Sequence, residues 1–248
     1  MITCKSEAEL ERMRRAGRIV AEVLEKLCER ARPGVTTASL DAWAEQYIRR
    51  RGGVPSFKGY RGYPASACIS IDEELVHGIP GRRRLREGQI VSFDVGVIYE
   101  GYHGDATVTI GIGEISEKAK DLLRVTEEAL RAGIAAARAG NRLGDVSHAI
   151  QVTAESQGYN VVREWVGHGI GKEMHEEPQI PNFGQAHRGP LLCPGMTLAL
   201  EPMLTVGDYR TRILDDMWTV VTVDGSLCAH FEHTIAVTED GAEILTRL

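Results

Sequence analysis

Two helices are predicted at the start of the chain, because apolar residues recur there at helical spacing. The first helix begins at the capping box Ser6-Glu7-Ala8-Glu9 and ends at Arg32-Pro33-Gly34, where proline cannot continue it. A second helix is predicted from about Thr37 to Arg51, and Gly52-Gly53 ends it. The apolar positions of the two helices are Leu10, Met13, Val20, Leu24, Leu27, Leu40, Trp43, Tyr47 and Ile48.

The same pair of helices returns later in the chain. Helical patterns run from Glu117 to Arg138 and from about Leu143 to Gln157. Matched residues, such as Leu24 and Leu130, lie 106 positions apart (130 − 24), and the strand patterns 88–94 and 195–201 repeat at an offset of 107 (195 − 88). A nearly constant offset predicts two similar halves, about 6–113 and 114–248, related by a pseudo-twofold axis within a single domain, 1–248.

A predicted β-hairpin places two carboxylates on one face. The β-rich run 90–98 contains Asp94, and a second run, 103–110, contains Asp105, with Glu100-Gly101 at the turn between them. A two-residue turn pairs Asp94 with Thr107, so Asp94 and Asp105 become diagonal neighbours, roughly 7–8 Å apart at Cα. Two interpretations of this pair are open. The hairpin face is exposed to solvent and has no special role, or a cation lies between the two carboxylates, because like charges repel unless something compensates them.

Three further side chains extend this set. Glu201 closes an apolar run before Pro202, Glu232 stands at the start of a predicted strand, and His168 lies in a glycine-rich stretch expected to form a turn. Each has an ordinary explanation when taken alone. Together, two Asp, two Glu and one His form an oxygen-rich set that suits hard or borderline divalent ions, and four carboxylates balance two such ions. The sequence therefore predicts a dinuclear metal centre.

Composition narrows the partners and the location. The 248 residues carry a formal net charge of −6, which argues against binding to nucleic-acid phosphates or anionic lipid. The N-terminal stretch lacks the apolar core of a signal peptide, and no window resembles a membrane span. The five cysteines are widely spaced without a Cys-x-x-Cys pair, so we expect reduced thiols in a cytoplasmic protein. Serine-nucleophile, Walker A and His-Glu-x-x-His motifs are missing from the sequence, which favours water as the nucleophile.

Short phrases along nearly the whole chain resemble those of the methionine aminopeptidases. They are Gly59-Tyr60-Arg61-Gly62-Tyr63-Pro64, Val76-His77-Gly78-Ile79-Pro80, Asp94-Val95, His103-Gly104-Asp105, Gly167-His168-Gly169-Ile170-Gly171, His175-Glu176-Glu177-Pro178, Glu201-Pro202-Met203 and Glu232-His233-Thr234. The resemblance implies an α+β pita-bread fold, a curved and mainly antiparallel sheet flanked by two helix pairs. The short spacing between Glu201 and Glu232, 31 residues (232 − 201), resembles type I rather than type II enzymes.

The resemblance also implies roles for individual residues. The implied metal ligands are Asp94, Asp105, His168, Glu201 and Glu232, holding two divalent ions drawn from Mn, Fe, Co or Zn. His77 and His175 are implied to face the substrate, with His175, Glu201 and His77 as the catalytic set. The implied methionine pocket consists of Tyr60, Tyr63, Cys68 and Trp218, with Phe57 and Met174 at two positions where relatives often carry Cys and Phe.

The reaction implied by the resemblance is metal-dependent hydrolysis that removes the N-terminal methionine from peptides and nascent proteins. An Xaa-Pro aminopeptidase on the same fold is the enzymatic alternative, and an inactive pita-bread module that binds peptides is the alternative outside catalysis. The expected partner is a peptide or nascent-chain N-terminus beginning with Met. We also expect a monomer that associates with the ribosome and does not bind nucleic acid specifically or a membrane.

Overall fold

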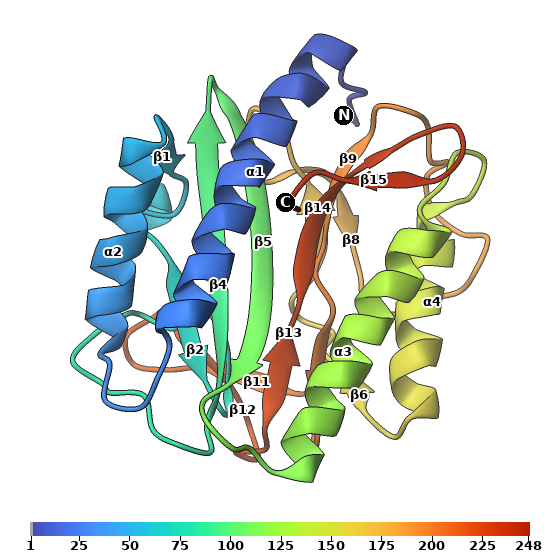
Figure 1. Cartoon of the computed structure of the whole chain (residues 1–248). Helices are drawn as coiled ribbons and strands as arrows, with labels where there is room; N and C mark the ends of the chain where they lie inside the picture. Colours follow the sequence, from blue (N-terminus) through green and yellow to red (C-terminus); the bar gives the residue numbers. More distant parts are fainter. Residues whose placement is uncertain (1) are drawn as a thin grey trace.

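Helices occupy the predicted positions. A computed structural model describes residues 2–248 (Figure 1). The helices are α1 (Glu7–Arg30), α2 (Thr37–Arg50), α3 (Glu117–Ala136) and α4 (Leu143–Ser156), with a short 3₁₀ turn, η1, at Tyr60–Gly62. The capping box is present at the start of α1, where the backbone N–H of Ser6 donates to Glu9 Oε2 at 2.8 Å. The predicted helices extend one or two residues too far at their C-terminal ends, where the last turn frays into irregular backbone.

The largest sheet in residues 2–248 is antiparallel at each recorded pairing. Its strands follow the order β1-β4-β5-β14-β9-β7-β8, with β2 paired to β4 and β15 paired to β14. Their bounds are β1 (Val54–Pro55), β2 (Cys68–Ile71), β4 (Ile90–Tyr99), β5 (Tyr102–Gly111), β7 (Gly167–Gly169), β8 (Glu176–Ile180), β9 (Thr197–Leu200), β14 (Glu232–Val237) and β15 (Ala242–Ile244).

Short strands form two smaller antiparallel sheets at the edge of the cavity described below. One has the order β11-β12-β3, with β3 at Glu74–Val76, β11 at Thr211–Ile213 and β12 at Val220–Thr222. The other has the order β13-β10-β6, with β6 at Asn160–Val161, β10 at Met203–Thr205 and β13 at Cys228–His230. Figure 1 shows the pair α1 and α2 beside β4, and the pair α3 and α4 on the side of β14.

Alternate side chains of strand β4 point to opposite faces of the sheet, and only one of these faces is covered by helices. On β4, Val91, Phe93, Val95 and Val97 pack into the apolar core beneath α1 and α2. Asp94 lies between them in sequence and therefore projects from the opposite face of the sheet. The same side of the sheet carries the helices at both ends, so its other face is left for polar groups.

Two glycines, Gly17 and Gly104, allow α1 to lie close against the sheet. A Cβ added to Gly104 on β5 would lie 2.8 Å from the backbone nitrogen of Gly17 on α1. A Cβ at Gly17 would lie 2.2 Å from the carbonyl oxygen of Leu245. Neither distance is compatible with a side chain, so both positions require glycine for this helix to contact the sheet.

The spacing of the elements agrees with the predicted repeat. Helices α2 and α4 begin at Thr37 and Leu143, 106 positions apart (143 − 37), and strands β4 and β9 begin at Ile90 and Thr197, 107 apart (197 − 90). The division into halves at about residue 113 stays a prediction. None of the helices within residues 2–248 combines the length and apolarity needed to cross a bilayer.

Candidate metal centre and substrate pocket

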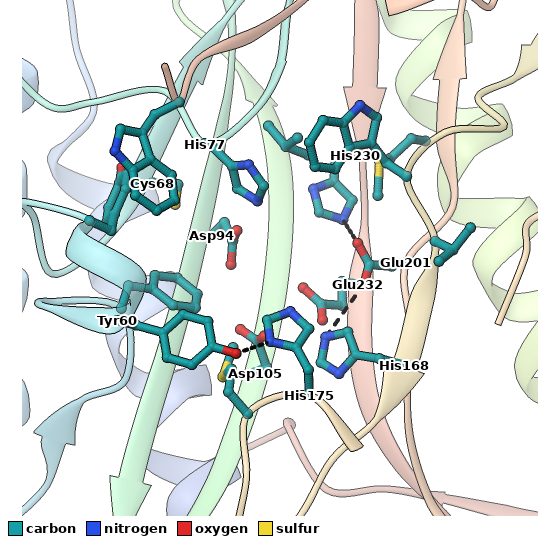
Figure 2. Close-up of a pocket in the computed structure, with 18 of the residues that line it drawn as sticks. Tyr60, Cys68, His77, Asp94, Asp105, His168, His175, Glu201, His230 and Glu232 are labelled. Carbon is teal, nitrogen blue, oxygen red and sulfur yellow. Dashed lines mark hydrogen bonds and ion pairs between the residues drawn. The ribbon is translucent and has the colours of Figure 1, made fainter. Parts of the chain in front are cut away.

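Five neighbouring strands bring the five predicted metal ligands together. Asp94 lies on β4, Asp105 on β5, Glu232 at the start of β14, Glu201 directly after β9 and His168 on β7. These strands are adjacent in the sheet in this order. The five side chains surround one cavity, as Figure 2 shows.

The register of the β4–β5 hairpin is the predicted one. Asp94 pairs with Thr107, and Tyr99 pairs with Tyr102 across the two-residue turn. Thr107 also pairs with Glu232 on the next strand, and its Oγ1 donates to Glu232 Oε2 at 2.9 Å. One threonine therefore sits between carboxylates of both halves and fixes the orientation of Glu232.

The prediction that His168 lies in a turn is wrong, because it occupies the short strand β7 and pairs with Ala199 on β9. The flanking glycines serve close strand packing instead of a turn. A Cβ at Gly167 would lie 2.4 Å from the Ala199 carbonyl oxygen, and one at Gly169 would lie 2.2 Å from the Glu177 carbonyl oxygen. Glycine on both sides thus lets His168 sit within the crowded sheet.

Burial and neighbouring negative charges disfavour the ionised form of the carboxylates in the cavity. Asp105 and Glu232 are each 3% exposed. Burial raises the pKa of Asp94 to about 7. It also raises the pKa of Asp105 and of Glu232 well above the usual range, and neighbouring carboxylates add to the rise. The pKa of Glu201 is raised for the same reasons. Such a cluster stays ionised near neutral pH only with a compensating cation.

The donor set fits a divalent metal. Asp105, His168 and Glu232 each offer a ligand atom, and these atoms lie within 4.8 Å of one another. Within residues 2–248, Asp94 Oδ1, Asp105 Oδ1 and Glu232 Oε1 are buried atoms without a hydrogen-bond partner. Unpaired buried carboxylate oxygens are costly, and a bound cation would satisfy all three.

His168 has the protonation and orientation of a metal ligand. Its Nδ1 lies 2.9 Å from the Gly169 carbonyl oxygen, so Nδ1 carries the proton and Nε2 presents a lone pair to the cavity. Burial lowers the pKa of His168 to about 3, which keeps the imidazole neutral. A neutral imidazole with its second nitrogen held by a carbonyl group is the usual arrangement of histidine at a metal.

The residues predicted to form the methionine pocket line the same cavity as the carboxylates, and this whole cavity has a volume of about 270 Å³. Tyr63, Cys68 and Met174 are buried in its wall, and Tyr60 and Trp218 pack against them. The rings of Tyr63 and Trp218 meet edge to face, with centroids 5.1 Å apart. The remaining predicted pocket residue, Phe57, belongs to the same apolar cluster.

The two histidines predicted to face the substrate, His77 and His175, lie at different sides of the cavity (Figure 2). Tyr60 Oη lies 2.8 Å from Nδ1 of His175, whose ring centroid is 4.3 Å from that of His168. His77 has a left-handed φ of 60° and packs edge to face on Trp165, with centroids 5.1 Å apart. This backbone conformation costs about 1 kcal/mol or more in a non-glycine residue, so surrounding packing must hold His77 in place.

Sequence reasoning missed several residues of the cavity. His230 is 2% exposed and lines the cavity beside Glu201. Other cavity residues outside the predicted set are Arg61, Val76, Glu164, Trp165, Val166 and Met203. Alternation was an available signal for His230, because it shares the parity of Glu232 in the run His230-Phe231-Glu232.

Comparison with known proteins defines the class. A sequence model of metallopeptidase family M24 matches residues 11–239. The chain belongs to this family of metal-dependent hydrolases and has its curled antiparallel sheet with four helices, the pita-bread fold.

Within the family, the similar relatives are methionine aminopeptidases. The chain is 54% identical to methionine aminopeptidase 1 of Bacillus subtilis over 248 residues, covering 100% of both chains. It is 56% identical to methionine aminopeptidase of Clostridium acetobutylicum, covering 99% of both. A crystal structure of methionine aminopeptidase from Thermotoga maritima superposes with a TM-score of 0.99 at 50% identity over 100% of both chains.

A more distant structure shares the fold alone. Prolidase from Pyrococcus furiosus superposes with a TM-score of 0.81 at 24% identity, covering 99% of this chain and 65% of that one. The fold therefore does not by itself distinguish one peptidase substrate from another.

Proposed function

We propose that this protein removes the N-terminal methionine from peptides, using two divalent metal ions held by Asp94, Asp105, His168, Glu201 and Glu232. The observation that carries the proposal is the placement of a small pocket of aromatic and sulfur-containing side chains directly beside the carboxylate cluster. The aromatic and sulfur-containing side chains on one wall of this cavity suit an unbranched thioether side chain. The similarity to methionine aminopeptidases over the full chain supports the same substrate.

When bound, the divalent ions lower the pKa of water and polarise the scissile carbonyl group. The residues of the chain would do the remaining work. Asp94, Asp105 and Glu232 offer the anionic oxygens that hold the cations, and His168 offers Nε2. The apolar wall around Cys68 and Met174 would exclude bulk water and fix the methionine side chain.

Glu201 is the proposed proton carrier. Its Oε1 lies 3.6 Å from His168 Nε2, so the carboxylate stands at the edge of the ligand cluster and faces the cavity. With the cations bound, its ionised carboxylate can accept a proton from water, and the same group can then deliver that proton to the leaving amine.

His175 and His77 are proposed to bind the reacting peptide group. Burial, and then the charge of Arg61, lower the pKa of His175, so it acts as a neutral hydrogen-bond donor through Nε2 while Nδ1 faces the Tyr60 hydroxyl. Such a donor stabilises negative charge that develops on the carbonyl oxygen. Burial lowers the pKa of His77 to about 4, and this neutral ring at the other side of the cavity would hydrogen-bond the peptide near the scissile nitrogen.

The test compares three peptides with the Mn²⁺-loaded protein. A Met-Gly-Met peptide should be cleaved with a kcat/KM at least about 10-fold above that of a Leu-Gly-Met peptide, since one pocket shape must discriminate the two side chains. An Ala-Pro peptide represents the Xaa-Pro alternative that shares this fold. Preference for the Ala-Pro peptide, or binding of all three without release of an amino acid, would replace the proposal by one of its alternatives.

We further propose that nascent chains leaving the ribosome are among the substrates and that the protein acts as a cytoplasmic monomer. The support is the proposed substrate, because a methionine at the N-terminus is a feature of newly made chains. Sedimentation of the purified protein, alone and with ribosomes, tests both parts. A stable dimer in the first measurement, or no co-sedimentation in the second, would contradict them.

A further inference from the structure

His230 is a buried polar residue that the proposed reaction does not use. It ends strand β13, where Thr109 Oγ1 accepts from its backbone N–H at 3.0 Å and donates to its carbonyl oxygen at 2.6 Å. Thr109 in turn faces Ser92 across the β4–β5 hairpin, with 2.8 Å between the two hydroxyl oxygens. The backbone of His230 is therefore fixed to the main sheet, and its ring is aimed into the cavity (Figure 2).

The ring nitrogen Nε2 of His230 has one evident acceptor. This buried atom has no hydrogen-bond partner within residues 2–248, yet it lies 3.7 Å from Glu201 Oε2. A distance of 3.7 Å is longer than a hydrogen bond, and a side-chain movement of about 0.5–1 Å would close it. A buried, unpaired ring nitrogen that faces a largely buried carboxylate is a costly arrangement unless the two groups meet.

Glu201 therefore stands between two imidazoles. Its Oε1 faces His168 at 3.6 Å, and its Oε2 faces His230 at 3.7 Å. The two oxygens have different surroundings, because His168 belongs to the ligand cluster and His230 does not. A donor on the Oε2 side would fix the carboxylate plane and leave Oε1 directed at the metal ligands, as outer-shell donors do at other metal centres.

We propose that His230 is a positioning residue for Glu201, donating a hydrogen bond from Nε2 to Oε2 so that Oε1 keeps its orientation toward the ligand cluster. This role deepens the proposed function, because it rests on Glu201 being both a ligand and the proton carrier. His230 itself touches neither the cations nor the peptide. The family comparison assigns no role to this residue, and its sequence context offers none beyond the shared parity with Glu232.

Two substitutions separate a donor from a space-filling group. His230→Gln keeps a side-chain N–H donor, whereas His230→Phe keeps a planar ring and removes the donor. The matched control is His233→Gln, because His233 is a nearby histidine whose Nδ1 bonds Thr246 Oγ1 at 2.9 Å and which lines a different cavity, against α3.

The first measurement is kcat and KM for a Met-Gly-Met peptide with the Mn²⁺-loaded proteins. His230→Phe should lower kcat by about 10–100-fold with KM within about 2-fold, the expected effect of losing one hydrogen bond to a charged group. His230→Gln should restore kcat to within about 3-fold of the unsubstituted protein. His233→Gln should match the unsubstituted protein in both constants.

The second measurement is calorimetric titration of the metal-stripped proteins with Mn²⁺, which does not depend on the peptide substrate. His230→Phe should bind the same number of ions about 10-fold more weakly, and His230→Gln should bind them normally. A failure of the methionine activity alone would therefore contradict the proposed function and leave this result intact.

Four results would overturn the role of His230. They are normal behaviour of His230→Phe, equal loss in His230→Gln and His230→Phe, a rise in KM at constant kcat, and the loss of a bound ion. The first would make His230 only a packing group, the second would make its ring shape decisive, the third would make it a substrate ligand, and the fourth would make it a metal ligand. Thermal melting of each metal-free variant beside the unsubstituted protein verifies that these comparisons concern folded proteins.

Discussion

One substitution in the carboxylate cluster should change the stability of the metal-free protein and of the metal-bound protein in opposite directions. Without metal, Asp94 is held where burial raises its pKa from 3.8 to about 7. Asn has no negative charge, and a negative charge is unfavourable at this buried position. Asp94→Asn should therefore stabilise the metal-free protein. With metal bound, the same substitution removes a proposed ligand and should destabilise the protein.

The magnitude follows from the pKa. A folded-state pKa above the unfolded value means that the folded state holds the proton more tightly, so stability falls as pH rises between 3.8 and about 7 and then levels off. At about 1.4 kcal/mol per pKa unit, the full effect at about pH 8 is about 4 kcal/mol. This figure is the share of Asp94 alone, and the partial exposure of Asp94 to the cavity reduces that share. At about pH 5.5 the effect is about 2 kcal/mol, so the advantage of Asn should grow by about 2 kcal/mol between these conditions.

The assay is urea unfolding of the metal-stripped proteins at both pH values, followed by thermal melting with saturating Mn²⁺. The buried histidines are common to both proteins and cancel in the difference. Loss of the Asp94 charge also lowers the raised pKa values of Asp105, Glu201 and Glu232, which acts in the same direction as the main effect. The exposed Asp215, changed to Asn, serves as the control for loss of one negative charge. The reasoning fails if metal-free Asp94→Asn is no more stable than the unsubstituted protein at about pH 8, or if its advantage is the same at both pH values.

Three further outcomes are expected. Chelation of the metal should lower Tm by several degrees, because the cations bind only the folded ligand set, and equal melting of both forms would contradict a central metal site. Trp218→Ala removes the ring that packs against Tyr63. It should reduce the preference for methionine over leucine at the first position by about 10-fold. An unchanged preference in paired kcat/KM measurements would show that Trp218 is not part of the pocket. His168→Ala should lose metal as well as activity, whereas His175→Ala should keep its metal and lose about 10²–10³ in kcat. Metal analysis of both purified variants, together with their kinetics, checks this prediction. Equal metal loss in the two variants would mean that His175 is a ligand.

The helices and the hairpin could be predicted because local chemistry determines them. Ser6 and Glu9 cap the first helix, Pro33 follows its end, and the two-residue turn at Glu100-Gly101 fixes the register that brings Asp94 opposite Thr107. Each of these signals acts within a few residues. The polar character of Asp94 within an apolar strand then marks the face of the sheet that carries the site.

His168 and His230 show where local signals end. The glycines beside His168 predict a turn, yet Gly167 is required by the carbonyl group of Ala199 on β9, 32 positions away (199 − 167), and Gly169 by that of Glu177 on β8. His230 precedes a break between β13 and β14 at Phe231, so whether it shares the cavity with Glu232 depends on how two sheets join. Contacts of this kind depend on the tertiary arrangement, so the alternation of His230 with Glu232 in the sequence does not determine them by itself.

The arrangement of the proposed ligands also bears on how the chain folds. Asp94 and Asp105 lie in the first predicted half, and His168, Glu201 and Glu232 lie in the second. Asp94 and Glu232 are 138 positions apart (232 − 94). Cations bound by both groups act as a reversible cross-link that closes a very long loop, the situation in which a cross-link removes most entropy from the unfolded chain. A growing chain that has not yet reached Glu232 contains only part of the proposed ligand set, so we expect the metal to bind tightly only after Glu232 has been synthesised.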